Sequence, residues 1–180
     1  MALEVPDRVQ QVLAQAVHAV RAQAPAGLRW SDPARCHLTV AFLGEVTHSQ
    51  LGHLSAGLTR AAARHRPPTV RVDGVGRFDG RVLWAAVVEE EASAGHLTGL
   101  ARSVAAASRR AGIALQERAY RPHLTLARAV RAVELRPLVA AMAGTSSGPW
   151  TARELHLVSS RLGPAPEHTT IRSFAIGPAG

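Results

Sequence analysis

The sequence predicts an α+β fold with two lobes, because the same order of elements occurs twice along the chain. The tripeptide His-Leu-Thr stands at 37–39 and again at 123–125, so the two histidines are 86 residues apart. Each copy lies in a strand-like run, preceded by an amphipathic helical pattern and followed by a helix and two strands. We expect a duplicated unit of about 86 residues, with lobes related by a pseudo-twofold axis in one compact domain over 1–180.

The first half of the chain predicts a helix, a strand, a second helix and a hairpin. Thr47 is a suitable N-cap for the second helix, and Gly44 ends the strand before it. Asp79 and Gly80 suit a tight hairpin turn. The expected elements are a helix at 6–23, a strand at 35–44, a helix from 47 to the proline pair at 67–68, and strands at 69–78 and 81–89.

The second half repeats this order. Leu97, Leu100 and Val104 recur at helical spacing, and Gly112 suits the end of that helix. The run RPHLTLARA again predicts a strand. The expected elements are a helix at 92–110, a strand at 121–129, a shorter helix at 133–142, and strands at 150–160 and 169–177.

The chain is basic, with a formal net charge of +8, and its basic residues are all arginine. The planar guanidinium suits phosphate, so the charge favours a nucleic acid or another phosphorylated partner. Arginine in place of lysine, with abundant Ala, Gly and Pro, is also typical of a GC-rich genome, and the charge alone does not separate these explanations.

The N-terminal segment and the cysteine count exclude several classes of protein. The sequence has no run of roughly 18 uncharged apolar residues, the length that a transmembrane helix needs. The N-terminal MALEVPDRVQ carries Glu4 and Asp7 and lacks the pattern of a signal peptide, so we expect a cytoplasmic protein without a membrane partner. Cys36 is the only cysteine, which excludes an internal disulfide and a cysteine-based zinc site.

The two His-Leu-Thr strands carry the chemistry. Residues two apart in a strand point to the same face, so His37 shares a face with Thr39, and His123 with Thr125. If the two strands meet, one neutral imidazole can take a proton from water and one protonated imidazole can give a proton to a leaving oxygen. The hydroxyls can donate to the charged oxygens of a phosphodiester. This scheme requires no metal and no cofactor.

Two arginines extend the predicted site. Arg128 follows His123 at the far end of its strand, where a guanidinium could hold a phosphate, whereas Phe42 has the equivalent place in the first copy. Arg121 is a second candidate for a basic rim. The remaining histidines lack the spacing of metal ligands, and we assign them no catalytic role. We expect the side chain of Cys36 to lie in the core. Chance tripeptides, or inherited structure without activity, remain alternatives at this point.

Four segments together match a known family: LRWSDPARCHLTVAFLGEV (28–46), RVLWAAV (81–87), RAYRPHLTLAR (118–128) and LHLVSSRLGPAPEHTTI (155–171). The chain resembles the two-histidine (2H) phosphoesterase superfamily, and within it the bacterial RNA 2′,3′-cyclic phosphodiesterases, also called 2′-5′ RNA ligases. The resemblance implies a bilobal fold that acts on RNA, with antiparallel sheets flanked by helices around a central basic groove. We expect the protein to be a monomer.

The resemblance also implies an activity and residue roles. The activity is metal-independent hydrolysis of a terminal 2′,3′-cyclic phosphate of RNA to a 2′-phosphate. His37 would be the proton donor to the leaving 3′ oxygen, and His123 the proton acceptor that activates water. Thr39, Thr125 and Arg128 would hold the phosphate.

The sequence also departs from that family. The strand that usually precedes the first helix is reduced to MALEVP, Ala41 replaces a frequent basic residue, and His168 stands where a tyrosine is common. Substrate preference is therefore less fixed than reaction type. Alternatives are a 2′-5′ RNA ligase, a phosphodiesterase of a small cyclic nucleotide, and an RNA-end binding module without turnover.

Overall fold

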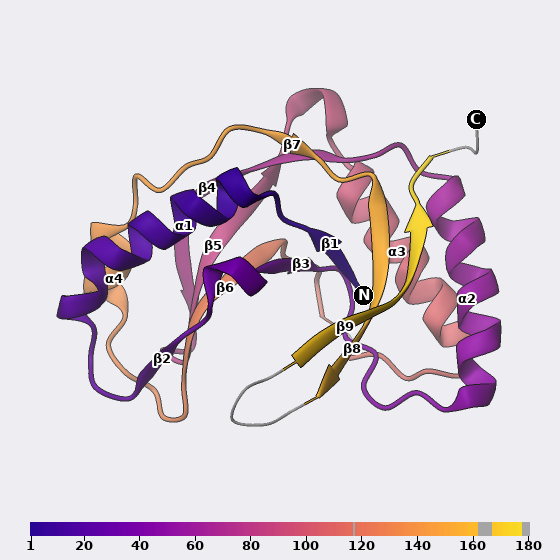
Figure 1. Cartoon of the computed structure of the whole chain (residues 1–180), viewed down its shortest axis with the longest axis horizontal. Helices are drawn as coiled ribbons and strands as arrows, with labels where there is room; N and C mark the ends of the chain where they lie inside the picture. Colours follow the sequence, from indigo (N-terminus) through magenta and orange to yellow (C-terminus); the bar gives the residue numbers. More distant parts are fainter. Residues whose placement is uncertain (117, 162–166, 178–180) are drawn as a thin grey trace.

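The computed structural model describes residues 1–116, 118–161 and 167–177, and within these ranges the chain forms helices and two antiparallel sheets (Figure 1). The helices are α1 (Asp7–Val20), α2 (His48–Ala63), α3 (His96–Arg110) and α4 (Arg136–Ala141). The strands are β1 (Ala2–Glu4), β2 (Leu28–Trp30), β3 (His37–Thr39), β4 (Thr69–Phe78), β5 (Val82–Glu89), β6 (His123–Ala129), β7 (Trp150–Thr151), β8 (Glu154–Arg161) and β9 (Glu167–Ala175).

One sheet has the strand order β3-β1-β8-β9 and the other has the order β2-β6-β5-β4-β7, with antiparallel pairing throughout. The predicted α+β class with antiparallel sheets and flanking helices is therefore confirmed. The two His-Leu-Thr strands, β3 and β6, belong to different sheets but contact each other. This contact brings the two motifs to the boundary between the sheets.

The sheets do not follow the two halves of the sequence. The second motif strand, β6, pairs with β5 of the hairpin that follows the first motif. The first motif strand, β3, pairs with β1, which in turn joins the late hairpin of β8 and β9. Each sheet thus combines a motif from one half with a hairpin from the other, and the 86-residue repeat itself stays a prediction.

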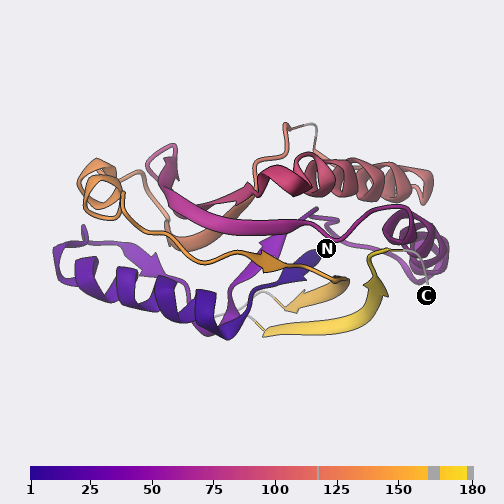
Figure 2. The same ribbon diagram turned by 90° about the horizontal axis from the view of Figure 1, so that it is seen from above.

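The helices lie in two groups at opposite ends of the molecule. The helices α2 and α3 pack against each other at one end, while α1 and α4 lie toward the other, as both views show (Figure 1 and Figure 2). Helix α1 buries one apolar face, made of Val9, Leu13, Val17 and Val20. None of the helices in the described ranges combines the length and apolarity that a membrane span needs.

Local signals that the sequence contains are found in the structure. Thr47 and Gln50 form a reciprocal capping box at the start of α2. Asp79 and Gly80, with φ values of 47° and 64°, form the turn between β4 and β5, and both angles lie in the left-handed region that such hairpin turns require. Gly112, with φ of 74°, follows α3 as expected.

Several boundaries differ from expectation. The strand expected at 35–44 is formed only over the three residues of β3. Its partner β1 is equally short. Beyond the pair, the amides of Val40 and Ala41 both donate to the same Met1 carbonyl, which departs from a regular ladder. Helix α3 begins late because Gly95 adopts φ of 82°, outside the helical region. Strand β2 was not expected, since three residues carry too little periodicity.

Candidate active site

The motif strands β3 and β6 present histidine and threonine on one face and leucine on the other. Leu38 and Leu124 are fully buried, whereas the histidines and threonines of both strands are half-buried. The alternation is the one expected for strands with one face on the core. Because β3 and β6 are in contact, the strand geometry brings His37 and His123 into one region.

Both motif imidazoles are oriented by the same type of hydrogen bond. Nδ1 of His37 lies 3.2 Å from the carbonyl oxygen of Arg35, and Nδ1 of His123 lies 2.7 Å from that of Arg121. A carbonyl oxygen can only accept, so Nδ1 is the protonated nitrogen in each ring. Nε2 is therefore the atom that gains or loses a proton in both histidines. The two motif histidines thus leave the same ring nitrogen, Nε2, free of this backbone contact.

A β-bulge in β6 turns Arg128 toward the threonine of the second motif. An odd separation would place Arg128 and Thr125 on opposite faces of a regular strand. The register against β5 shifts at this point, with Thr125 opposite Trp84 and Ala127 opposite Leu83. The extra residue changes the alternation, and Nη2 of Arg128 donates to Oγ1 of Thr125 at 3.4 Å. Arg128 thus lies beside the threonine of the second motif.

Strand β2 brings a second arginine to this place. Arg29 lies directly opposite Arg128 in the antiparallel pair of β2 and β6, and both side chains are exposed. Directly opposite residues project from the same face of a sheet. Arg121, the other predicted rim residue, contributes its backbone carbonyl to the orientation of His123, and its side chain is exposed.

The environment of His37 differs from that of His123. The ring of His168 from β9 contacts the His37 ring edge to face, with centroids 4.9 Å apart. Burial lowers the pKa of His37 below its ordinary value; the hydrogen bond to Arg35 opposes this shift, and the charges of His168 and of the Met1 amino group add to it. Ser160 lies 2.9 Å from Nδ1 of His168 and fixes that ring.

Two aromatic rings lie on one side of His123. Phe78 lies edge-on to the His123 ring at 5.2 Å between centroids and stacks on Trp84 at 4.9 Å. Trp84 lies over Gly76, where any side chain would collide with the indole ring. The stack gives this side of the site an apolar wall, a surface on which a nucleobase can stack.

Comparison with known proteins assigns the chain to a family. The family model described as the 2′-5′ RNA ligase superfamily matches residues 5–164, most of the chain. The chain belongs to this superfamily. The resemblance to two-histidine phosphoesterases is thereby confirmed, although residues 162–166 of one matching segment lie outside the described residues.

Curated relatives of this superfamily carry the name RNA 2′,3′-cyclic phosphodiesterase. The protein of Archaeoglobus fulgidus is 30% identical over 154 residues, which cover 82% of this chain and 84% of that protein. The protein of Aquifex aeolicus is 28% identical over 158 residues and is covered to 82%. The protein of Geobacillus stearothermophilus is also 28% identical, but the match spans only 47% of its length.

Solved structures agree with the fold of the superfamily. TT0787 of Thermus thermophilus superposes with a TM-score of 0.80 at 27% identity, covering 99% of this chain and 97% of that one. Escherichia coli LigT, crystallised with 3′-AMP, gives a TM-score of 0.73 at 24% identity, covering 97% and 95%. The latter likeness concerns the fold alone.

The sequence pattern alone did not reveal several residues around the motifs of this superfamily member. Arg29 lies on a strand too short to predict, and Phe78, Trp84 and His168 come from strands far away in sequence. Arg29, Trp84 and His168 lie in segments that resemble the family, but of these three only His168 stands out in the sequence, as a departure from the expected pattern. Within the described ranges, no three His, Cys, Asp or Glu side chains are placed to share a metal ion.

Proposed function

We propose that this protein hydrolyses the terminal 2′,3′-cyclic phosphate of RNA to a 2′-phosphate without a metal ion. The observation that carries the proposal is the pair of imidazoles on contacting strands, each held through Nδ1 by a backbone carbonyl, with Nε2 left for proton transfer. The names of the curated relatives support the same activity.

The reaction needs one proton to be removed and one to be supplied. Nε2 of His123 takes a proton from water as the oxygen attacks phosphorus. The bond from phosphorus to the 3′ oxygen breaks, and Nε2 of His37 gives its proton to that oxygen. The products are a 2′-phosphate and a 3′-hydroxyl group, and the two histidines exchange protonation states.

Arginine and threonine stabilise the charge that develops on the non-bridging oxygens. The guanidinium of Arg128 provides a planar pair of N–H donors. The hydroxyls of Thr39 and Thr125 provide further donors, on the strand faces that also carry His37 and His123. Because burial lowers the pKa of His37 in the free protein, its protonated form is a stronger acid than an ordinary imidazolium. A bound phosphate anion opposes that shift, because it stabilises the imidazolium.

The direct test uses protein treated with EDTA and an RNA oligonucleotide with a 2′,3′-cyclic phosphate end. We expect conversion to a 2′-phosphate, with the phosphate position determined by NMR. His37→Ala and His123→Ala should each lower kcat by about 10²–10⁴-fold, whereas His18→Ala, on the exposed face of α1, should leave the rate unchanged. Near-normal turnover in either motif variant would refute the two-histidine mechanism, and a requirement for added metal would refute metal independence.

Other products of the same assay separate the alternatives. New 2′-5′ linkages would identify a ligase, which runs the same chemistry in reverse. Turnover confined to a small cyclic nucleotide, such as ADP-ribose cyclic phosphate, would identify the second enzyme class. Tight binding with cyclic ends recovered intact would identify an RNA-end binding module.

A further inference from the structure

A pocket that the motif chemistry does not use lies between α2 and α3. Its volume is about 350 Å³, and it is lined by Gly57, Arg60, Ala61, Arg64, Ser103, Ala106 and Arg110. All of these residues belong to α2 or α3 or directly follow them, and none belongs to the motif strands β3 and β6. A phosphate held by the two motif histidines therefore leaves this pocket free.

The two helices are fixed against each other, so the pocket is already formed in the free protein. Gln50 donates to the carbonyl of Gly112 at 2.9 Å at one end of the pair. His65 and Ser103 are joined by a hydrogen bond of 2.8 Å at the other end. Between these ties α2 and α3 approach closely, since a Cβ on Gly57 would lie only 3.2 Å from that of Ala107.

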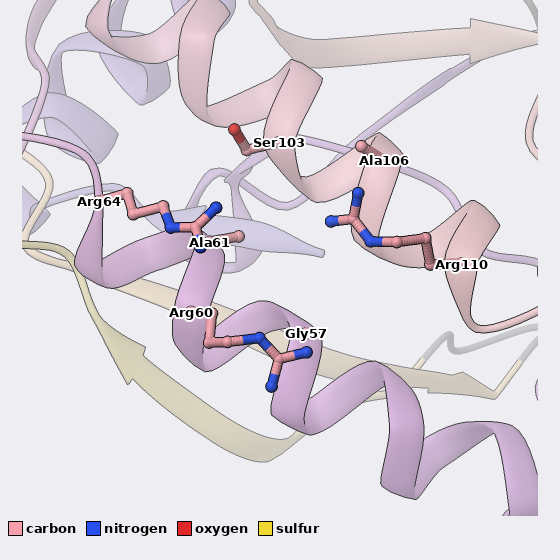
Figure 3. Close-up of a pocket in the computed structure, with 7 residues that line it drawn as sticks. All are labelled: Gly57, Arg60, Ala61, Arg64, Ser103, Ala106 and Arg110. Carbon is pink, nitrogen blue, oxygen red and sulfur yellow. The ribbon is translucent and has the colours of Figure 1, made fainter.

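The pocket is lined by cations without matching anions. Arg64 and Arg110 extend from opposite helices toward the space between them, with Arg60 on the α2 side (Figure 3). The sequence has no acidic residue between Glu45 and Asp73, or between Glu91 and Glu117, so neither helix supplies a counter-charge. Among the described residues, none of the three guanidinium groups forms an ion pair with a carboxylate.

We infer that this arginine pocket binds a phosphate of the RNA strand whose end occupies the motif site. Three permanent positive charges around one small pocket repel one another, and a phosphate group relieves that repulsion while accepting bidentate hydrogen bonds. Contacts to backbone phosphates hold an RNA strand without reading its sequence. The identity of the polymer as RNA rests on the proposed function, whereas the binding of phosphate rests on the pocket alone.

The test compares two double variants with equal loss of charge. Arg64→Gln with Arg110→Gln removes guanidinium groups that line the pocket, and Arg102→Gln with Arg109→Gln removes groups of α3 that do not. Binding is measured by fluorescence anisotropy with a single-stranded RNA of about 12 nucleotides that ends in an uncleavable 3′-phosphate. A 3′-phosphorylated mononucleotide is the short ligand. The unfolding temperature of each variant controls for folding.

We expect the pocket variant to bind the long RNA roughly tenfold more weakly than the unmodified protein. The negative slope of log K against log salt should become shallower by about 1. The α3 control should stay within about twofold, and mononucleotide binding should not change in either variant. An equal loss of RNA affinity in both double variants would overturn the proposal, because it would show that the overall positive charge of the helices attracts RNA and not the pocket. Unchanged RNA binding, or an equal loss for the mononucleotide, would overturn it as well. Because no turnover is measured, failure of cyclic-phosphate hydrolysis in the other assay leaves this result interpretable.

Discussion

Arg29 and Arg128 lie directly opposite each other on antiparallel neighbours, β2 and β6, and project from the same face of the sheet. Like charges in this arrangement destabilise a sheet by a few tenths of a kcal/mol or more. Neither guanidinium forms an ion pair with a carboxylate in the part of the chain that the structure describes. Arg128 also bonds Thr125 of the second motif, so an anion bound there is attracted by both arginines.

This arrangement predicts opposite effects on stability and activity. Arg29→Gln should raise the free energy of unfolding by about 0.2–1 kcal/mol and lower kcat/KM for cyclic-phosphate RNA roughly fivefold, the effect of losing one exposed charge contact. Urea unfolding and steady-state kinetics measure the two effects. Inorganic phosphate should stabilise the unmodified protein more than the variant. Arg21→Gln, an exposed arginine after α1, is the matched control, and equal behaviour of both variants would contradict the prediction.

The contact of His168 with His37 predicts a change in pH dependence. His168 contributes to lowering the pKa of His37, so His168→Phe, which keeps a ring but removes the charge, should raise it. If His37 is the acid, kcat/KM falls as the pH rises through the pKa of His37, which in the unmodified protein lies below the ordinary 6.5. The substitution should then move the falling limb to higher pH.

The same profile tests the assignment of roles. A shift of the rising limb, with the falling limb unchanged, would make His37 the base and reverse the roles taken from the family. His156→Phe replaces another histidine of the same sheet, which is bonded to Ser173 and has no ring contact with His37 among the described residues. Its profile should match that of the unmodified protein.

The close approach of Gly76 and Trp84 predicts that the aromatic wall depends on the glycine. Gly76→Ala forces the Trp84 indole, and with it Phe78, away from the present stack beside His123. We expect a loss of about 1–3 kcal/mol in the free energy of unfolding and weaker binding of the terminal nucleotide, seen as a higher KM. Gly52→Ala, in an open position of α2, should instead stabilise by about 0.5–1 kcal/mol. If Gly76→Ala changes neither the free energy of unfolding nor KM, the aromatic wall does not depend on the glycine.

How much the sequence can predict depends on whether a feature is local. The N-cap at Thr47, the hairpin turn at Asp79 and the alternation of the two motifs are short-range patterns, and the structure confirms them. The bulge that turns Arg128 toward Thr125 depends on the register with β5, which a single strand does not encode. The approach of His168 to His37 requires the path of β8 and β9 across the sheet.

Tyr120 connects the segment before the second motif to the first motif strand, because its hydroxyl donates to the carbonyl of Thr39 at 3.2 Å. Tyr120→Phe keeps the packing but leaves that carbonyl without its partner, which should cost about 1–2 kcal/mol in the free energy of unfolding. We also expect kcat to fall with KM nearly unchanged, because the bond positions the two motifs relative to each other and not the substrate itself. Thr98→Val, which removes an exposed hydroxyl bonded to Glu89, is the control for a lost surface hydrogen bond. If kcat is unchanged in Tyr120→Phe while stability falls, the hydrogen bond is structural only, and the contact of β3 with β6 suffices to align the histidines.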